Sequence, residues 1–369
     1  MSPIEYRERM LLLGEDLRRD LRRPSRRELI GFLAAANLLA RPRGEDHFLR
    51  NQNAKKGKID VHHHVGPPPG MSTGGAGGPA WSPEIAIEEM DRNGVATGIG
   101  FPGPIPFSSN SSADLERGRK LARVYNEYAA QIGRDHPGRF GVFASLPMHD
   151  VEGALQEIEY ARNVLQADGF GISTSYGDMW LGDPKLRPIF EELNRPGAVV
   201  YVHPNDAVCC TPATMSYEKN GISGAWIEWP MNTARTILSV LVAGYTRDFP
   251  NVRFIFSHAG GVMPLLISRI QGFTDWAAVS PEKLRQMFPE GIGVEFRKFY
   301  FEGAQGFDAP NFDAIRKLAP DSHLLFGTDY NRFPIAHTVR IFENLKLPAK
   351  TKYAMERGNA ENLLPRWRA

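Results

Sequence analysis

From residue 58 onward, short apolar runs alternate with longer segments of helical periodicity. The apolar runs, which we expect to be buried strands, are 58–64, 95–101, 139–146, 169–174, 198–203, 253–258, 298–302 and 323–329. The segments expected to be helices begin at Ser82-Pro83 and then cover 114–135, 151–166, 184–195, 231–248, 262–272 and 309–318. Strands that are apolar almost throughout and alternate with helices predict a (β/α)8 TIM barrel, in which helices surround a closed parallel sheet.

A doubly wound open sheet is the alternative α/β architecture for this alternation. Such a fold usually carries a glycine-rich dinucleotide fingerprint at its first strand–helix junction. The segment after residue 64 contains many glycines and prolines but not that fingerprint. The barrel, over residues 58–369, is therefore the favoured architecture.

Residues 1–57 form an extension outside this alternation. Arg26-Arg27 precedes the apolar run 29–40, and small residues lie near its end. This pattern over 25–40 predicts a twin-arginine signal for export to the periplasm. The alternative is an amphipathic helix that lies on the barrel of a cytoplasmic protein.

The composition is that of an ordinary globular protein, with 42% hydrophobic and 23% charged residues. The formal net charge is +2, and the excess of Lys and Arg is confined to residues 1–58. Nothing in this balance favours a nucleic acid or a membrane surface as a partner. No apolar stretch approaches the ~20 residues of a membrane span. We expect a small molecule as the partner.

The only two cysteines, Cys209 and Cys210, are adjacent. Adjacent cysteines close a small ring with difficulty, so we expect two free thiols and no structural disulfide.

The candidate chemistry begins with Asp60-x-His62-x-His64 at the end of the first expected strand. Side chains alternate faces along a strand, so His62 and His64 should point one way and His63 the other. Two imidazoles side by side provide half of a divalent-metal site. Taken alone, the triplet is equally compatible with a histidine-rich surface turn.

The ends of other strands supply further metal-competent side chains. In a parallel barrel the chemistry lies at the carboxyl ends of the strands. His203 ends the fifth expected strand, His258 the sixth and Asp329 the eighth. Each histidine by itself could be a satisfied core residue, but a set gathered at one rim indicates a metal centre.

These residues occur in motifs that resemble the amidohydrolase superfamily. More narrowly, they resemble its decarboxylase branch, typified by enzymes acting on 2-amino-3-carboxymuconate-6-semialdehyde, γ-resorcylate and 6-methylsalicylate. The motifs are Asp60-x-His62-x-His64, His203-Pro204, Ser257-His258-Ala259-Gly260-Gly261 and Gly327-Thr328-Asp329-Tyr330. The resemblance covers residues 58–365.

The resemblance implies that one divalent metal is bound by His62, His64, His203 and Asp329. Zinc is expected and manganese is the alternative, since both suit a nitrogen-rich site with one carboxylate. His258 would be the unligated histidine that moves protons beside the metal. Asp329 is the second candidate for that catalytic role.

For the substrate, the resemblance points to Arg269, Arg235 and Trp81. Arg269 lies eleven residues after His258 and resembles an arginine that homodimers of this branch insert into the neighbouring subunit's pocket. The alternative interpretation is that Arg269 is an exposed arginine on a helix, with no role in the site. Arg235 follows Met231 and Asn232, where Phe and Asp are usual, and the chain also departs from the family at Asn331 and Glu302.

The expected function is metal-dependent, cofactor-free decarboxylation of an aromatic or unsaturated carboxylic acid, a carbon–carbon lyase reaction that releases CO2. The alternative is hydrolysis of a lactone, amide or ester, because zinc lowers the pKa of bound water to roughly 7. A third hypothesis is a non-catalytic barrel with a vestigial site, against which the complete ligand set argues.

Overall fold

The computed structural model describes residues 56–69, 71, 81–107, 109–211, 221–275 and 280–368. The twin-arginine segment expected around 25–40 lies outside these residues, so export stays a prediction. Within the described residues, no helix combines the length and the apolar character that crossing a membrane requires.

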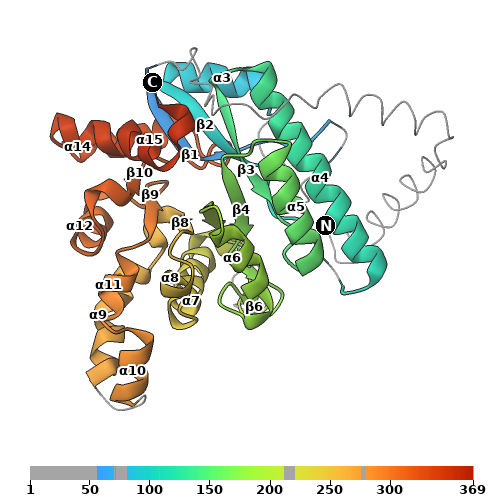
Figure 1. Ribbon diagram of the computed structural model, residues 1–369. Helices are drawn as coiled ribbons and strands as arrows, with labels where there is room; N and C mark the ends of the chain where they lie inside the picture. The colour runs from blue at the N-terminus through green and yellow to red at the C-terminus, as the bar shows by residue number, and fades with distance from the viewer. Residues whose placement is uncertain are drawn as a thin grey trace. The chain divides into compact units, whose positions relative to one another are not determined.

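Eight parallel strands form one sheet in chain order. Most of their labels can be followed in Figure 1. The strands are β1 (Lys58–His64), β2 (Val95–Phe101), β3 (Phe140–Ser145), β4 (Gly169–Ser173), β7 (Val199–His203), β8 (Arg253–Phe256), β9 (Tyr300–Glu302) and β10 (Leu324–Leu325). The sheet closes between its first and last strands: Val61 N–H donates to the Phe326 carbonyl (3.0 Å), and Asp329 N–H donates to the His62 carbonyl (2.8 Å). The prediction of a (β/α)8 barrel is confirmed.

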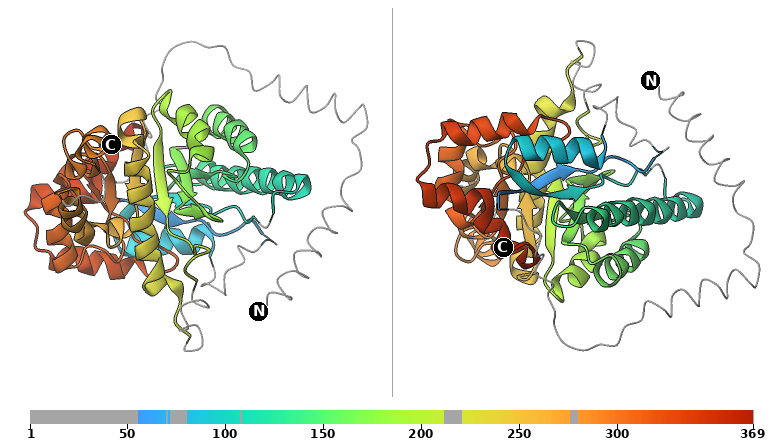
Figure 2. Two further views of the ribbon diagram at one scale, coloured as in Figure 1. Left: turned by 90° about the horizontal axis from the view of Figure 1, so that it is seen from below. Right: turned by 90° about the horizontal axis from the view of Figure 1, so that it is seen from above.

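Helices surround this barrel (Figure 2). They are α3 (Pro83–Arg92), α4 (Ser112–Asp135), α5 (Val151–Asn163), α6 (Arg187–Asn194), α7 (Glu228–Val242), α8 (Tyr245–Asp248), α9 (Met263–Asp275), α12 (Ala309–Leu318) and α13 (Ile335–Asn344). The start of α3 is as predicted, because Ser82 Oγ accepts the N–H of Ile85 (3.2 Å). The single helix expected over 231–248 is divided between α7 and α8 at Gly244, whose φ is 77°.

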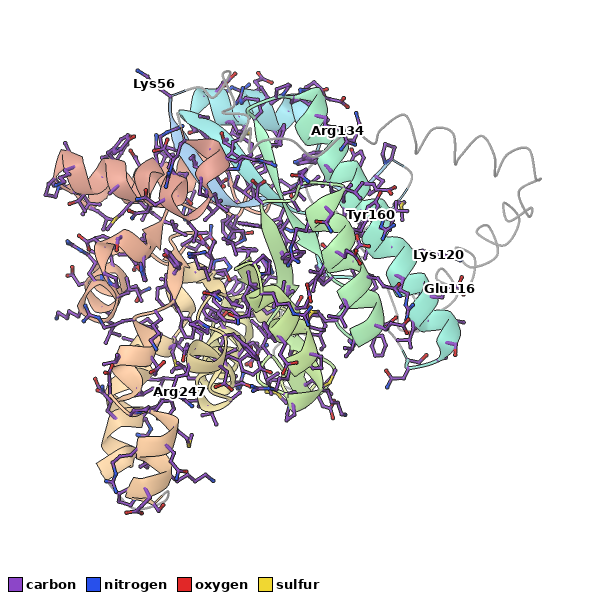
Figure 3. The ribbon with its side chains drawn as sticks, viewed as in Figure 1. Lys56, Glu116, Lys120, Arg134, Tyr160 and Arg247 are labelled. Atoms are coloured by element: carbon purple, nitrogen blue, oxygen red, sulfur yellow. A yellow bond between two sulfur atoms is a disulfide. The ribbon has the colours of Figure 1, made fainter. Side chains whose placement is uncertain are left out.

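Several elements were not predicted. They are the hairpin of β5 (Ser175–Tyr176) and β6 (Met179–Trp180) and the helices α10 (Pro281–Met287), α11 (Ile292–Phe296), α13 (Ile335–Asn344), α14 (Ala349–Tyr353) and α15 (Asn359–Leu363). The outer helix faces carry charged pairs, such as Glu116 and Lys120 one turn apart on α4 (2.7 Å; Figure 3). Such exposed pairs are typical of a solvated helix face and contribute little to stability.

Two strands end earlier than expected. β8 stops at Phe256 and β10 at Leu325, whereas the sequence predicted strands up to His258 and Asp329. Both residues have left-handed backbone conformations, with φ of 53° for His258 and 60° for Asp329. Non-glycine residues adopt this conformation at a cost, and such residues cluster at functional sites.

A β-bulge in β1 aims the histidines. Asp60 pairs with Gly98 and His63 with Gly100, so the register of β1 against β2 shifts between these two pairs. Such a shift bends the strand and re-aims its side chains. Ile59 and Val61 pack in the barrel core, whereas the side chains of His62 and His64 lie together with those of His203 and Asp329.

Candidate metal centre

Four side chains converge at one rim of the barrel, from the ends of β1 and β7 and from the segment after β10. One ligand atom from each of His62, His64, His203 and Asp329 lies within 4.8 Å of the others. The ring centroids of His62 and His203 are 5.2 Å apart, and those of His64 and His203 are 5.0 Å apart. The structure thus brings together all four residues that the sequence singled out as ligands.

The hydrogen bonds of the outer ring nitrogens leave the inner ones for a metal. His62 Nδ1–H donates to Glu302 Oε1 (2.7 Å), and His203 Nδ1–H donates to the Pro204 carbonyl (2.7 Å). The Nε2 atom of His203 is buried and has no hydrogen-bond partner among the described residues. The Nε2 atom of His62 is also buried and lies 3.2 Å from Asp329 Oδ1. Buried nitrogen atoms without partners are costly, and a cation among them removes that cost. The three imidazoles and one carboxylate therefore fit a divalent metal.

Asp60 connects β1 to the segment after β10 through hydrogen bonds. Its Oδ1 accepts the backbone N–H groups of His62 (3.0 Å) and Thr328 (3.0 Å), and its Oδ2 accepts the Thr328 hydroxyl (2.5 Å). His63 Nδ1–H also donates to Oδ2 (3.1 Å), and its ring packs against Tyr330. The middle histidine is thus turned away from the ligand cluster, as the strand period predicts.

Burial and charge set the protonation of the ligands. Burial lowers the pKa of His64 and holds that of His203 well below its ordinary value, which favours the neutral imidazoles that metals bind. Burial also opposes charge on His62, but the carboxylates of Glu302 and Asp329 raise its pKa to about 10. Burial would raise the pKa of Asp329; His62 and His64 nevertheless hold it well below its usual value. The carboxylates of Glu302 and Asp329 therefore favour a positive charge at His62.

His258 lies beside this cluster without belonging to the four ligands. Its ring centroid is 5.1 Å from that of His62, and its Nδ1–H donates to the Ala304 carbonyl (2.9 Å). The Nε2 atom is therefore the ring nitrogen left for proton exchange. This position suits the proton-moving role that the resemblance implies, and that role stays a prediction.

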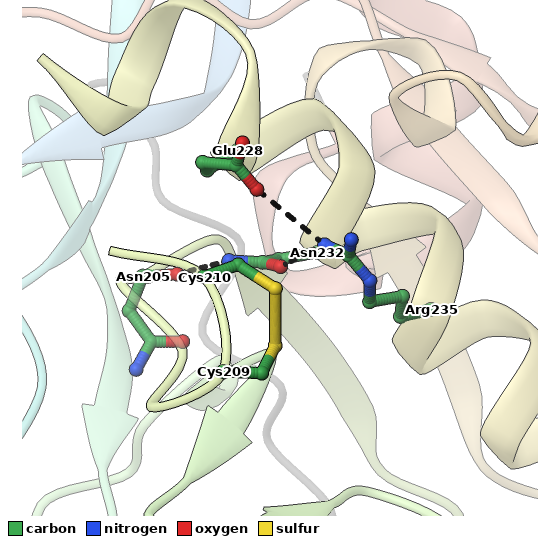
Figure 4. The surroundings of a disulfide bond; sticks show 6 residues. All are labelled: Asn205, Cys209, Cys210, Glu228, Asn232 and Arg235. Carbon is green, nitrogen blue, oxygen red and sulfur yellow. Dashed lines mark hydrogen bonds and ion pairs between the residues drawn. A yellow bond between two sulfur atoms is a disulfide. The ribbon is translucent and has the colours of Figure 1, made fainter. Parts of the chain in front are cut away.

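The three residues predicted for substrate contact lie in different places. Trp81 packs its indole against the backbone of Gly66, two residues after His64, so it borders the site. Arg235 on α7 donates to Asn232 Oδ1 (2.6 Å) and pairs with Glu228 (3.7 Å), as Figure 4 shows. Arg269 on α9 is exposed, with its guanidinium over the ring of Phe273. The structure places neither arginine among the ligand cluster of its own chain.

The prediction of two free thiols is wrong. Cys209 and Cys210 are joined by a disulfide in the loop that follows His203 (Figure 4). The loop turns at this point, where Cys210 N–H donates to the Ala207 carbonyl (3.0 Å). The strain of a small ring between adjacent cysteines is visible in the sequence, whereas this turn of the loop is not.

Two residues near the site were not proposed for a role. Glu302, noted only as a departure from the family, is fully buried beneath His62. Arg332 is exposed three residues after Asp329, and its N–H donates to the Asp329 carbonyl (2.8 Å). No hydrogen bond or ion pair engages its guanidinium among the described residues. Its place directly after the last ligand motif is a signal that could have identified it.

Comparison with known proteins decides the family. The amidohydrolase family model matches residues 59–366, nearly the whole barrel and its carboxyl-terminal segment. The chain belongs to the amidohydrolase family. The predicted superfamily is confirmed.

Similar proteins within this family are decarboxylases. The 6-methylsalicylic acid decarboxylase of Penicillium expansum is 33% identical over 326 residues, covering 84% of this chain and 96% of the relative. The structure of 2,6-dihydroxybenzoate decarboxylase with 2,6-dihydroxybenzoate has a TM-score of 0.73 at 20% identity, covering 84% of this chain and 100% of the other. Dihydroxybenzoic acid decarboxylase of Polaromonas sp., with bound manganese and 2-nitroresorcinol, has a TM-score of 0.71 at 22% identity and covers 85% and 98%. Both structural likenesses support the barrel fold of this amidohydrolase.

Proposed function

We propose that this amidohydrolase is a metal-dependent, non-oxidative decarboxylase of an aromatic carboxylic acid that carries a hydroxyl beside the carboxylate. The observation that carries the proposal is the complete ligand set beside His258, in a chain 33% identical to a 6-methylsalicylic acid decarboxylase. The hydrolase alternative has no support among these relatives.

We propose one divalent cation held by His62, His64, His203 and Asp329. When bound, it would supply positive charge that holds and orients the hydroxy acid in the site. Three nitrogens and one oxygen suit either zinc or manganese. The manganese in the Polaromonas structure makes that metal the first to test beside zinc.

His258 supplies the acid in this proposal. Its Nε2 is the ring nitrogen that would carry the proton, because its Nδ1–H is fixed to the Ala304 carbonyl. Transfer of the Nε2 proton to the ring carbon that bears the carboxylate makes a new C–H bond. The C–C bond to the carboxylate then breaks, its electrons restore the aromatic ring, and CO2 leaves. A positioned acid of this kind contributes about 10²–10⁴-fold to rate.

Arg332 is the cation that we propose for contact with the substrate anion. Its position beside Asp329 is fixed by a backbone hydrogen bond, and no carboxylate of the described residues neutralises it. An Arg guanidinium binds carboxylates in a bidentate geometry. Arg235 is engaged with Asn232 and Glu228, and a role for Arg269 requires a second copy of the chain.

Release of CO2 tests this function. Purified protein is stripped of metal, reloaded with zinc or manganese, and incubated with 6-methylsalicylate or γ-resorcylate. We expect CO2 and the decarboxylated phenol, with the ring intact. Metal-loaded protein that releases no CO2 from hydroxylated aromatic acids but hydrolyses lactones or esters would refute the proposal.

A further inference from the structure

The buried carboxylate of Glu302 contacts both halves of the proposed active site. It ends β9, and its side chain is completely shielded from solvent. Oε1 accepts from His62 Nδ1 (2.7 Å) and from the backbone N–H of His258 (2.8 Å). One oxygen atom thus joins a predicted metal ligand to the predicted proton donor.

The second oxygen extends this arrangement. Oε2 accepts the backbone N–H of Ala304 (2.7 Å), and the Ala304 carbonyl in turn accepts the Nδ1–H of His258. Glu302 therefore holds the backbone of His258 directly and the ring of His258 through Ala304. These bonds also support the left-handed backbone of His258, whose φ is 53°.

Glu302 could instead be a metal ligand itself, because it forms a second cluster with His62 and His258. Its hydrogen bonds argue against this. Three N–H groups already occupy its two oxygens, and His62 faces it through Nδ1, not through the Nε2 atom that faces Asp329. The carboxylate is arranged to orient its neighbours.

We propose that Glu302 is a positioning residue that fixes His62 for metal binding and His258 for proton transfer at the same time. By accepting the Nδ1–H of His62, it fixes the tautomer whose Nε2 lone pair is free for the cation. By holding His258 and Ala304, it directs His258 Nε2 toward the bound acid. The second part rests on the proposed decarboxylase function, whereas the first does not.

The fit around Glu302 leaves it little freedom. A Cβ atom at Gly327 would lie 2.1 Å from Glu302 Oε2 and 2.9 Å from the Cβ of His62. The absence of a side chain at residue 327 thus provides the space in which the carboxylate reaches His62. Glutamine at residue 302 fits the same space, but its NH2 group must face at least one N–H donor.

The test compares Glu302→Gln with a matched control, Glu295→Gln. Glu295 is also buried, and its carboxylate accepts from Thr246 (2.6 Å) and Lys298 (2.7 Å). Zinc and manganese dissociation constants are measured for the metal-free proteins by competition with a chelator. We expect roughly a 10–100-fold weaker metal affinity in Glu302→Gln, as is typical when the partner of a metal-bound histidine is lost. The control should keep the wild-type affinity.

A second readout addresses His258. At saturating metal, Glu302→Gln should lower kcat for CO2 release while KM stays near the wild-type value, because the acid is misplaced and substrate contacts remain. Glu302→Asp keeps the charge, so its metal affinity should lie between those of the wild type and Glu302→Gln. If Glu302→Gln does not fold, Glu302→Asp carries the test, with an affinity below that of the wild type expected.

Unchanged metal affinity in both Glu302 variants, or equal losses in Glu302→Gln and Glu295→Gln, would overturn the inference. Metal binding needs no substrate, which keeps the two proposals separable. The wild-type protein could bind metal and release no CO2, while Glu302→Gln binds metal more weakly. That result would refute the decarboxylase function and support the positioning of His62.

Discussion

His64 Nε2 lies 2.9 Å from Asp329 Oδ1, although 265 residues separate the two in sequence. The same oxygen lies 3.2 Å from His62 Nε2. These atoms meet only because β1 and the segment after β10 are joined by backbone hydrogen bonds at the closure of the barrel. The proposed metal site therefore connects the first and last strands of the fold.

Removing the metal should lower stability as well as activity. A ligand that binds only the folded state at 100 times its dissociation constant adds about 2.7 kcal/mol. We expect a chelator to lower the melting temperature measured by calorimetry, and added zinc or manganese to restore it. A melting temperature that is the same with and without metal would contradict a cation bound across the barrel closure.

The middle histidine provides a control for the ligands. His64→Ala should abolish stoichiometric metal binding, because one of three nitrogen ligands is lost. His63→Gln should retain the metal, since His63 faces Asp60 and Tyr330 instead of the cluster. Elemental analysis of the two purified variants checks this. Metal loss in His63→Gln with metal retained in His64→Ala would reverse the assignment.

Metal binding should release a proton at neutral pH. In the metal-free protein burial opposes charge on His62, yet Glu302 and Asp329 raise its pKa to about 10, so the ring is protonated below that pH. The metal requires the neutral ring, and its affinity should therefore fall as the pH falls below about 10. Titration calorimetry in buffers of different ionisation enthalpy measures the proton. Binding at pH 7 without proton release would show that His62 is already neutral.

Arg332 can be tested against a second arginine. Arg332→Ala should raise KM for the acid roughly 10–150-fold, because one charge-assisted hydrogen-bonded contact of about 1.5–3 kcal/mol is lost. Arg235→Ala should leave KM nearly unchanged, because Arg235 is engaged with Asn232 and Glu228. Steady-state kinetics of CO2 release distinguishes them. If Arg235→Ala raised KM more than Arg332→Ala does, the contact with the substrate carboxylate would be assigned to Arg235 on α7.

Much of the barrel and of the ligand set could be predicted from local pattern. Apolar runs define most strands, and the period of two separates His63 from His62 and His64. The end points of β8 and β10 could not be predicted, because His258 and Asp329 have left-handed backbones that no apolar pattern records. The role of Glu302 was also hidden, since its contacts with His62 and His258 depend on residues brought together by the sheet. The disulfide of Cys209 and Cys210 depends on a turn of the loop after β7.

CO2 release by metal-free and metal-reloaded protein from a 2-hydroxylated aromatic acid is the decisive test of a metal-dependent decarboxylase. We expect no release without metal, release after zinc or manganese is added, and a loss of about 10²-fold or more in metal-loaded His258→Ala. Equal release with and without metal would refute the role of the metal, and full turnover by His258→Ala would refute that of His258.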